Sequence, residues 1–337
     1  MRHHAIFHRS RILTVCCVLL FFIMIFMAAG CSSAQDDAEG ATVKSAPTDT
    51  SGSDKKADSG AEALRDNTPA VLTPEASGTT VYGDDTVTID ASHTSEGYVM
   101  VNYSGDNEKV KFQVKTPDGT EYTYLVTDYG NYAVYPLPGG NGSYTLTLLE
   151  VIQADKDLYA IAFTQQMDVE ISNEFSPFLY PNKYVAFTAD SKSVAKGKKL
   201  AADCGSDLEV IANIYNYVIK NVSYDDEKAE NVSYGYTPDA DETLSSKKGI
   251  CFDYAALMCA MLRTQRIPTR LEVGYAGDAS HAWISCSVAE IGWINDIIEF
   301  DGTDWTLMDP TYAASHNNSS VKKYIGDGSR YVLKYTY

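Results

Sequence analysis

Residues 248–270 read Lys-Gly-Ile-Cys-Phe-Asp-Tyr-Ala-Ala-Leu-Met-Cys-Ala-Met-Leu-Arg-Thr-Gln-Arg-Ile-Pro-Thr-Arg. The stretch after Gly249 contains no further Gly or Pro until Pro268, which predicts an amphipathic helix from Cys251 to about Gln265. Cys251 then lies in the first turn of this helix. Unpaired backbone N–H groups and the positive end of the helix dipole favour the thiolate there, and the thiolate is the nucleophilic form of cysteine.

Two later segments carry groups that could assist such a thiol. Ser280-His281-Ala282-Trp283 places a histidine early in a predicted strand, and Met308-Asp309-Pro310 places an aspartate where a strand ends. An imidazole takes the thiol proton and returns it to a leaving amine, and a carboxylate on its far nitrogen fixes the tautomer. The backbone N–H of Cys251 is well placed for an oxyanion hole. The sequence therefore predicts a Cys-His-Asp site for nucleophilic catalysis.

At these residues the chain resembles the transglutaminase-like superfamily, whose papain-like core has a helix-borne Cys followed by His and Asp on adjacent strands. Residues 249–255 have the form G-x-C-x-D-[YF]-A, and residues 263–270 resemble R-x-x-G-I-P-x-R with Arg266 where Gly is usual. The His and Asp segments follow in order, with spacings of 30 and 28 residues from Cys to His and from His to Asp. The resemblance covers roughly 180–337, and its specific part is 207–313.

The resemblance implies that Cys251 is the nucleophile, His281 the base and acid, and Asp309 the orienting group. The family often has Asn-Glu after His-Ala-Trp, whereas Ile284-Ser285 stand here. This departure leaves the triad unchanged and bears on the substrate groove.

Other residues near these motifs have two readings each. Trp283 lies on the same strand face as His281. It therefore either lines the substrate groove or belongs to the core. Tyr236 could donate a second oxyanion hydrogen bond, although a residue of a turn is the simpler interpretation. Asp253 is expected to be structural, because an acid in a first helical turn caps the helix. His316 is a reserve histidine.

The remaining cysteines and acids predict no metal site. We expect Cys259 to pack on the core face of the helix, and Cys204 and Cys286 to be free and buried, although an exported protein permits a bridge between them. No Cys/His spacing fits zinc, and the acids at 239–242 lack the spacing of a calcium loop. No cofactor is expected either, since the thiol supplies the chemistry.

The N-terminus is typical of an exported lipoprotein. Three Arg precede an apolar run at 12–27, and Ala28-Ala29-Gly30-Cys31 resembles a bacterial lipobox. Residues 1–30 are therefore predicted to be a signal peptide and Cys31 the lipidated residue that anchors the chain to the membrane. The alternative is an uncleaved anchor helix, although 16 apolar residues are short for a span. Either reading places the body outside the cytoplasmic membrane.

The rest of the chain predicts an α+β protein, with a transglutaminase-like domain at 175–337 preceded by an all-β sandwich domain at 75–172. Residues 31–74 are poor in large apolar side chains and are predicted to be a disordered tether. Alternating apolar and polar residues indicate the sandwich. Its strands are expected at 86–89, 98–103, 109–115, 122–124, 132–135, 144–149, 158–164 and 167–171.

Charge and cysteine content exclude two classes of protein. The chain has 27 Lys+Arg and 45 Asp+Glu, and such an acidic balance lacks the basic footprint that a nucleic acid requires. Seven Cys in 337 residues are too few for a disulfide-built scaffold.

We therefore expect a surface-tethered cysteine acyl-transfer enzyme, with a peptidase or amidase favoured over a cross-linking transglutaminase. Its substrates would be protein or cell-wall peptides. The alternative from another class is a surface or cell-wall binding protein with an inactive transglutaminase-like scaffold. A purely structural spacer fails on the intact Cys-His-Asp set. The oligomeric state is left open by the sequence.

Overall fold

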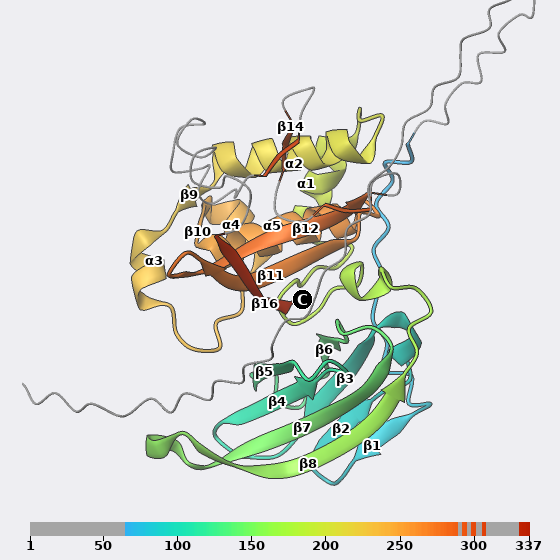
Figure 1. Cartoon of the computed structure of the whole chain (residues 1–337), viewed down its shortest axis with the longest axis vertical. Coiled ribbons are helices and arrows are strands. Elements are labelled where there is room, and N and C mark those ends of the chain that lie inside the picture. Colours follow the sequence, from blue (N-terminus) through green and yellow to red (C-terminus); the bar gives the residue numbers. More distant parts are fainter. Residues whose placement is uncertain (1–64, 289–291, 295–297, 301–304, 308–329) are drawn as a thin grey trace, which may run out of the picture. The chain divides into compact units, whose positions relative to one another are not determined.

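The structure, a computed structural model, describes residues 65–288, 292–294, 298–300, 305–307 and 330–337 (Figure 1). The predicted signal peptide, Cys31, Asp309 and His316 lie outside the described residues. Within the described part of the chain, no helix is long and apolar enough to cross a membrane.

The first half of the described chain folds into two antiparallel four-stranded sheets. The first sheet has the order β1-β2-β3-β6, with strands β1 (Val81–Gly83), β2 (Val87–Asp90), β3 (Tyr98–Tyr103) and β6 (Ala133–Pro136). The second has the order β5-β4-β7-β8, with strands β4 (Val110–Lys115), β5 (Glu121–Val126), β7 (Gly142–Gln153) and β8 (Leu158–Val169).

The two sheets share one core, as the alternating pattern predicts. In β4, Val110, Phe112 and Val114 are fully buried, and the residues between them are partly exposed. The ring of Phe112 lies 4.6 Å from the ring of Tyr135 on β6, so side chains of the two sheets meet. Such interdigitation of two inner faces is the packing of a β-sandwich, and the prediction of antiparallel β-sheets in this half is confirmed.

The prediction of two separate strands at the end of the sandwich is wrong. It expects two strands, at 158–164 and 167–171, whereas β8 is one strand of 12 residues that pairs with the equally long β7. The polar pair Gln165-Gln166 interrupts the apolar pattern, but β8 is an edge strand. Polar side chains are tolerated there because one side of the strand faces water.

The second half of the described chain contains the helices and a further antiparallel sheet. The helices are α1 (Lys192–Ala201), α2 (Asp207–Asn221), α3 (Asp226–Asn231), α4 (Ala240–Ser246) and α5 (Cys251–Arg263). The four-stranded sheet has the order β13-β12-β11-β16, with strands β11 (Thr269–Ala276), β12 (Ala279–Val288), β13 (Gly292–Ile294) and β16 (Tyr331–Thr336). This half also contains two separate two-stranded sheets. One pairs β9 (Ser223–Tyr224) with β10 (Lys248–Gly249), and the other pairs β14 (Ile298–Phe300) with β15 (Trp305–Leu307).

Helix α5 is the centre of this half (Figure 1). It packs on β11 and β12, while α1, α2 and α4 pack against it. Every residue from Asp253 to Arg263 is buried, so the helix is more enclosed than an amphipathic surface helix. At its last turn the buried Arg263 donates to the carbonyls of Tyr180, Thr269 and Tyr337. This guanidinium joins α5 to the connection that contains Tyr180, to the start of β11, and to the residue that follows β16.

Helix α2 begins with two capping contacts at Ser206 and Glu209. The Ser206 Oγ accepts from the Glu209 N–H at 3.3 Å, while the Glu209 carboxylate accepts from the Gly205 N–H at 2.6 Å. The carboxylate thus reaches one residue further back than in a regular capping box.

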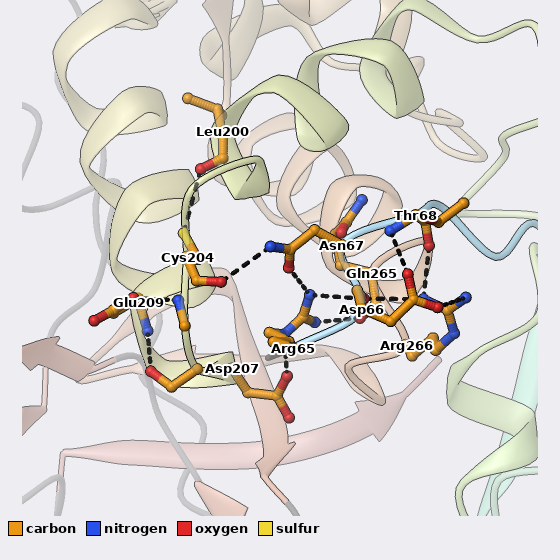
Figure 2. Close-up of polar contacts among 12 residues, drawn as sticks. Arg65, Asp66, Asn67, Thr68, Leu200, Cys204, Asp207, Glu209, Gln265 and Arg266 are labelled. Atoms are coloured by element: carbon orange, nitrogen blue, oxygen red, sulfur yellow. Dashed lines mark hydrogen bonds and ion pairs between the residues drawn. The ribbon is translucent and has the colours of Figure 1, made fainter. Parts of the chain in front are cut away.

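Residues 65–74 correct the predicted tether, because they begin with a segment bonded to the helical half (Figure 2). The Arg65 Nε donates to the Asp207 Oδ1 at 2.6 Å, and its second guanidinium nitrogen donates to the Gln265 carbonyl at 2.5 Å. The Asn67 Nδ2 donates to the Cys204 carbonyl at 3.0 Å. Composition indicates disorder because the segment is polar, but polar side chains can order a chain when buried carbonyls and carboxylates accept from them. The tether prediction for residues 31–64 lies outside the described residues.

Candidate functional site

Cys251 is the first residue of α5, as the sequence predicts, and its side chain is partly exposed. The short parallel pair β9–β10 leads directly into it. Gly249 is required at this approach, since a Cβ there would lie 2.7 Å from the Cβ of Asp253. The N–H groups of a first helical turn have no intrahelical acceptor, so those at Cys251 can serve a developing oxyanion.

His281 lies on β12, opposite Gly274 of β11. Its ring is stacked on that of Trp283 with a centroid distance of 6.2 Å, and the Tyr331 ring lies 6.3 Å away. Trp283 is 2% exposed and does not line the cavity described below. The structure therefore supports the interpretation of Trp283 as a core residue, whose ring stacks on the imidazole of His281.

Cys251 and His281 line the same cavity, whose volume is about 480 Å³. We call it the Cys251 cavity. The structure thus brings together two of the three predicted catalytic residues, which are 30 positions apart in the chain. The third, Asp309, lies outside the described residues, and strand β15 ends two positions before it. Its orienting role stays a prediction.

One wall of the Cys251 cavity is the segment 229–236, which includes the end of α3 and the loop after it. This segment, the cavity rim, is attached to α5 through Asp253. The Lys228 Nζ lies 2.7 Å from the Asp253 Oδ2, and the Tyr236 hydroxyl donates to the Asp253 Oδ1 at 2.5 Å. Asp253 also accepts from the Ile250 N–H at 2.8 Å. One buried carboxylate therefore caps α5 and binds both Lys228, which directly precedes the rim, and Tyr236, its last residue.

The pKa values of Lys228 and Tyr236 are shifted by these contacts with Asp253. Burial by itself lowers the pKa of Lys228, but the hydrogen bonds with Asp253 and Tyr236 outweigh burial and raise it above its usual value. Burial and the hydrogen bond to Asp253 raise the pKa of Tyr236 to about 12. Lys228 is therefore a cation and Tyr236 a neutral phenol at neutral pH.

Tyr236 lines the cavity, but not as the oxyanion donor that the sequence reading considers. Its hydroxyl hydrogen is given to Asp253, and its oxygen accepts from the Lys228 ammonium. A phenol has a single O–H donor, so none is left for a second acceptor. The interpretation as a structural residue of a loop is the one that the contacts support.

The other three cysteines of the described chain are free and buried, as expected. Burial raises the pKa of Cys259 to about 12, and it also raises the pKa values of Cys204 and Cys286. These thiols are thus inert packing groups. Across the described residues, no cluster of three or more His, Cys, Asp or Glu could hold a metal ion.

Several cavity residues could not be found from the sequence. Tyr184 comes from the connection between the two halves, Tyr335 from β16, and Tyr337 from the residue directly after β16. Nothing in their neighbourhoods resembles a motif, and only the fold brings them to Cys251. Asp253 was visible as a capping residue, but its partner Lys228 lies 25 positions away in a short helix without apolar periodicity.

Comparison with known proteins agrees with this architecture. Residues 195–296, which include Cys251 and His281, match the transglutaminase-like superfamily. The chain carries a transglutaminase-like core. The N-terminal antiparallel sheets and the mixed second half together form the α+β fold that the sequence predicts. None of the curated proteins compared with the chain matches it.

Three solved structures are similar to the chain at low identity. A candidate cysteine protease from Cytophaga hutchinsonii is 17% identical over 77% of this chain and 74% of that chain, with a TM-score of 0.36. The periplasmic domain of TgpA from Pseudomonas aeruginosa is 13% identical over 75% and 100%, with a TM-score of 0.32. Red sea bream transglutaminase is 14% identical over 64% and 48%, with a TM-score of 0.25.

Proposed function

We propose that this chain is a cysteine acyl-transfer enzyme that cleaves amide bonds as a peptidase or amidase. The observation that carries the proposal is that a partly exposed thiol at a helix N-terminus, Cys251, and an imidazole, His281, line one cavity. The three other described cysteines are buried and line no part of that cavity. A thiol used only for packing would be expected to lie with them.

The proposed reaction uses Cys251 and His281 in the roles that the sequence predicts for them. His281 takes the proton of Cys251, and the thiolate forms a bond to the carbonyl carbon of the amide. The C–N bond then breaks, the amine leaves with the proton from His281, and a thioester remains on Cys251. Water deprotonated by His281 attacks the thioester, which releases the acid and restores the thiol. Asp309 would orient the imidazole, as the resemblance implies.

Hydrolysis is tested on the full-length protein with a fluorogenic peptide amide. We expect turnover by the wild type and a loss of about 1000-fold or more in kcat/KM for Cys251→Ala and for His281→Ala. Cys204→Ser and His93→Ala are matched controls, since neither residue lines the cavity, and both should retain activity. Turnover by Cys251→Ala at the wild-type rate would exclude the proposal.

An amine added to the same assay separates hydrolysis from transfer. If water is the second substrate, the acid is the product even when a primary amine is present at millimolar concentration. If the amide of the added amine accumulates instead, the enzyme is a cross-linking transglutaminase. A protein that binds the peptide without any turnover would be the binding protein with an inactive scaffold.

We also propose that the enzyme works outside the cytoplasmic membrane, attached through a lipid on Cys31. The support is the sequence of residues 1–31 alone. Metabolic labelling with a fatty acid, followed by membrane fractionation, tests it. We expect label and membrane association in the wild type and neither in Cys31→Ala. Labelling that persists in this variant would contradict the anchor.

A further inference from the structure

The side chains that line the Cys251 cavity are uncharged apart from the titratable His281. Among the described residues that form its walls, none is Asp, Glu, Lys or Arg. This is unexpected in a chain with 45 Asp+Glu and 27 Lys+Arg. Lys228 belongs to the adjoining helix, but its ammonium is paired with Asp253. Apart from His281, which the proposed reaction uses, the described walls offer a charged group of a substrate no oppositely charged side chain, so its loss of water in this cavity is unfavourable.

Seven of the 17 described residues that line the Cys251 cavity are Tyr or Phe. Phe252 follows the nucleophile directly, with the Tyr184 ring at 5.2 Å and the Tyr236 ring at 6.5 Å. Tyr335 of β16 and Tyr337, the residue directly after β16, also line the cavity. Faces and edges of such rings bind other aromatic or large aliphatic side chains favourably.

Contacts from the β-sandwich hold these rings in place. On β5, Tyr124 stacks with Tyr184 at 5.5 Å, and Tyr122 contacts Tyr335 at 5.3 Å. Tyr124 is fully buried. The aromatic wall is thus fixed before a substrate arrives, and a preformed site avoids the ordering cost of binding.

We infer that the substrate is an uncharged peptide segment with a large apolar or aromatic side chain next to the amide that Cys251 attacks. The inference rests on the proposed function, because the Cys251 thiol attacks the amide and the cavity binds the substrate side chain next to that amide. A volume of about 480 Å³ is enough for one such side chain together with adjacent backbone. A short acidic peptide is the alternative class, and no Lys or Arg among the described lining residues would pair with its carboxylates.

A peptide series tests the inference on the full-length protein. The fluorogenic peptide amides differ only in the residue next to the cleaved bond, which is Phe, Leu, Gly, Glu or Lys. We expect kcat/KM for Phe and Leu to exceed that for Glu and Lys by about 10- to 100-fold, the range given by burial of one large apolar side chain. Equal rates across the series, or faster cleavage of the Glu or Lys peptide, would overturn the inference.

A charge placed on the cavity rim gives a second readout. Val232 lines the cavity and is 42% exposed, so Val232→Lys should fold. We expect this variant to raise kcat/KM for the Glu peptide relative to the Phe peptide by about 10-fold, as one new charge pair would. Ile152→Lys is the matched control, since Ile152 is 63% exposed on β7 and lines no part of the cavity. An identical ratio in both variants would show that this cavity does not read the substrate residue.

Binding to Cys251→Ala separates the two proposals. The wild type could cleave no peptide while Cys251→Ala still binds the Phe peptide at least 10-fold more tightly than the Glu peptide. In that case the proposed hydrolysis fails, and the preference of the cavity for a large apolar side chain is supported. If the wild type cleaves peptides and Cys251→Ala binds all of them equally, hydrolysis stands and the substrate class is wrong.

Discussion

The Lys228 ammonium lies 2.7 Å from the carboxylate of Asp253, and Asp253 is fully buried two residues after the candidate nucleophile Cys251. This ion pair joins the first turn of α5 to the helix that begins the cavity rim. Two elements that are separate in the sequence are thereby held at one place: the helix that presents the thiol and the wall that faces it.

The first prediction concerns this ion pair. Asp253→Asn keeps the size of the side chain but removes the charge, so Lys228 loses its partner. We expect a decrease of about 1–2 kcal/mol in the free energy of unfolding, measured by urea titration, and a raised KM for the peptide amides. Glu227→Gln is the control, because it removes an exposed carboxylate from α3, the helix that carries Lys228. Equal stability of the two variants would contradict a structural role for the pair.

The pH dependence of stability supplies a second prediction. The pKa of Lys228 is raised, and that of Tyr236 is raised to about 12, so both groups hold their protons more tightly in the folded state. The stabilisation is complete below the unfolded values of about 10 and is lost as pH rises toward 12. Unfolding free energies measured between pH 9 and 12 should therefore fall more steeply for the wild type than for Asp253→Asn. Parallel curves would exclude this linkage.

The third prediction is selective alkylation of one thiol. Cys251 is partly exposed, whereas Cys204, Cys259 and Cys286 are buried with raised pKa values. We expect iodoacetamide at pH 7 to modify Cys251 at least 10-fold faster than the other three, with the sites read by peptide mass. In 8 M urea all four should react alike. Rapid modification of Cys259 in the folded protein would show that α5 is not buried as described.

The fourth prediction concerns Gly274, which pairs with His281 across β11 and β12. A Cβ at Gly274 would lie 2.0 Å from the Val332 carbonyl oxygen and 3.0 Å from the Trp283 ring. Gly274→Ala must therefore displace β16 or the Trp283 ring. We expect it to lower the free energy of unfolding by about 1–3 kcal/mol, measured by urea titration. Gly205→Ala is the control, since its nearest contact would be an ordinary 3.7 Å. A stable, active Gly274→Ala would argue against this close approach of the strands.

The fifth prediction tests the segment before the sandwich. The Arg65 side chain is 10% exposed and bonds to Asp207 and to the Gln265 carbonyl. Arg65→Ala should lower the free energy of unfolding by about 2 kcal/mol, because it leaves those acceptors without a charged donor. Lys198→Ala removes an exposed cation from α1 and should be near neutral. No difference between the two would mean that the tether extends through residue 74.

The local features of the fold were readable because each depends on residues close in sequence. The alternating pattern at 109–115 predicts β4, and the stretch without Gly or Pro after Gly249 predicts α5. Helices α3 and α4 were missed because they are short and lack apolar periodicity. Tertiary contacts, not propensity, stabilise helices of that length.

By itself, the sequence determined the elements and the chemistry at each end of the site: a thiol at a helix start and an imidazole early in a strand. Side-chain type and local backbone pattern suffice for both. Only the tertiary structure decided that Cys251 and His281 line one cavity, that Asp253 joins α5 to Lys228, and that tyrosines from distant segments line that cavity. These depend on which surfaces pack together over long sequence separations, and no local pattern records that choice.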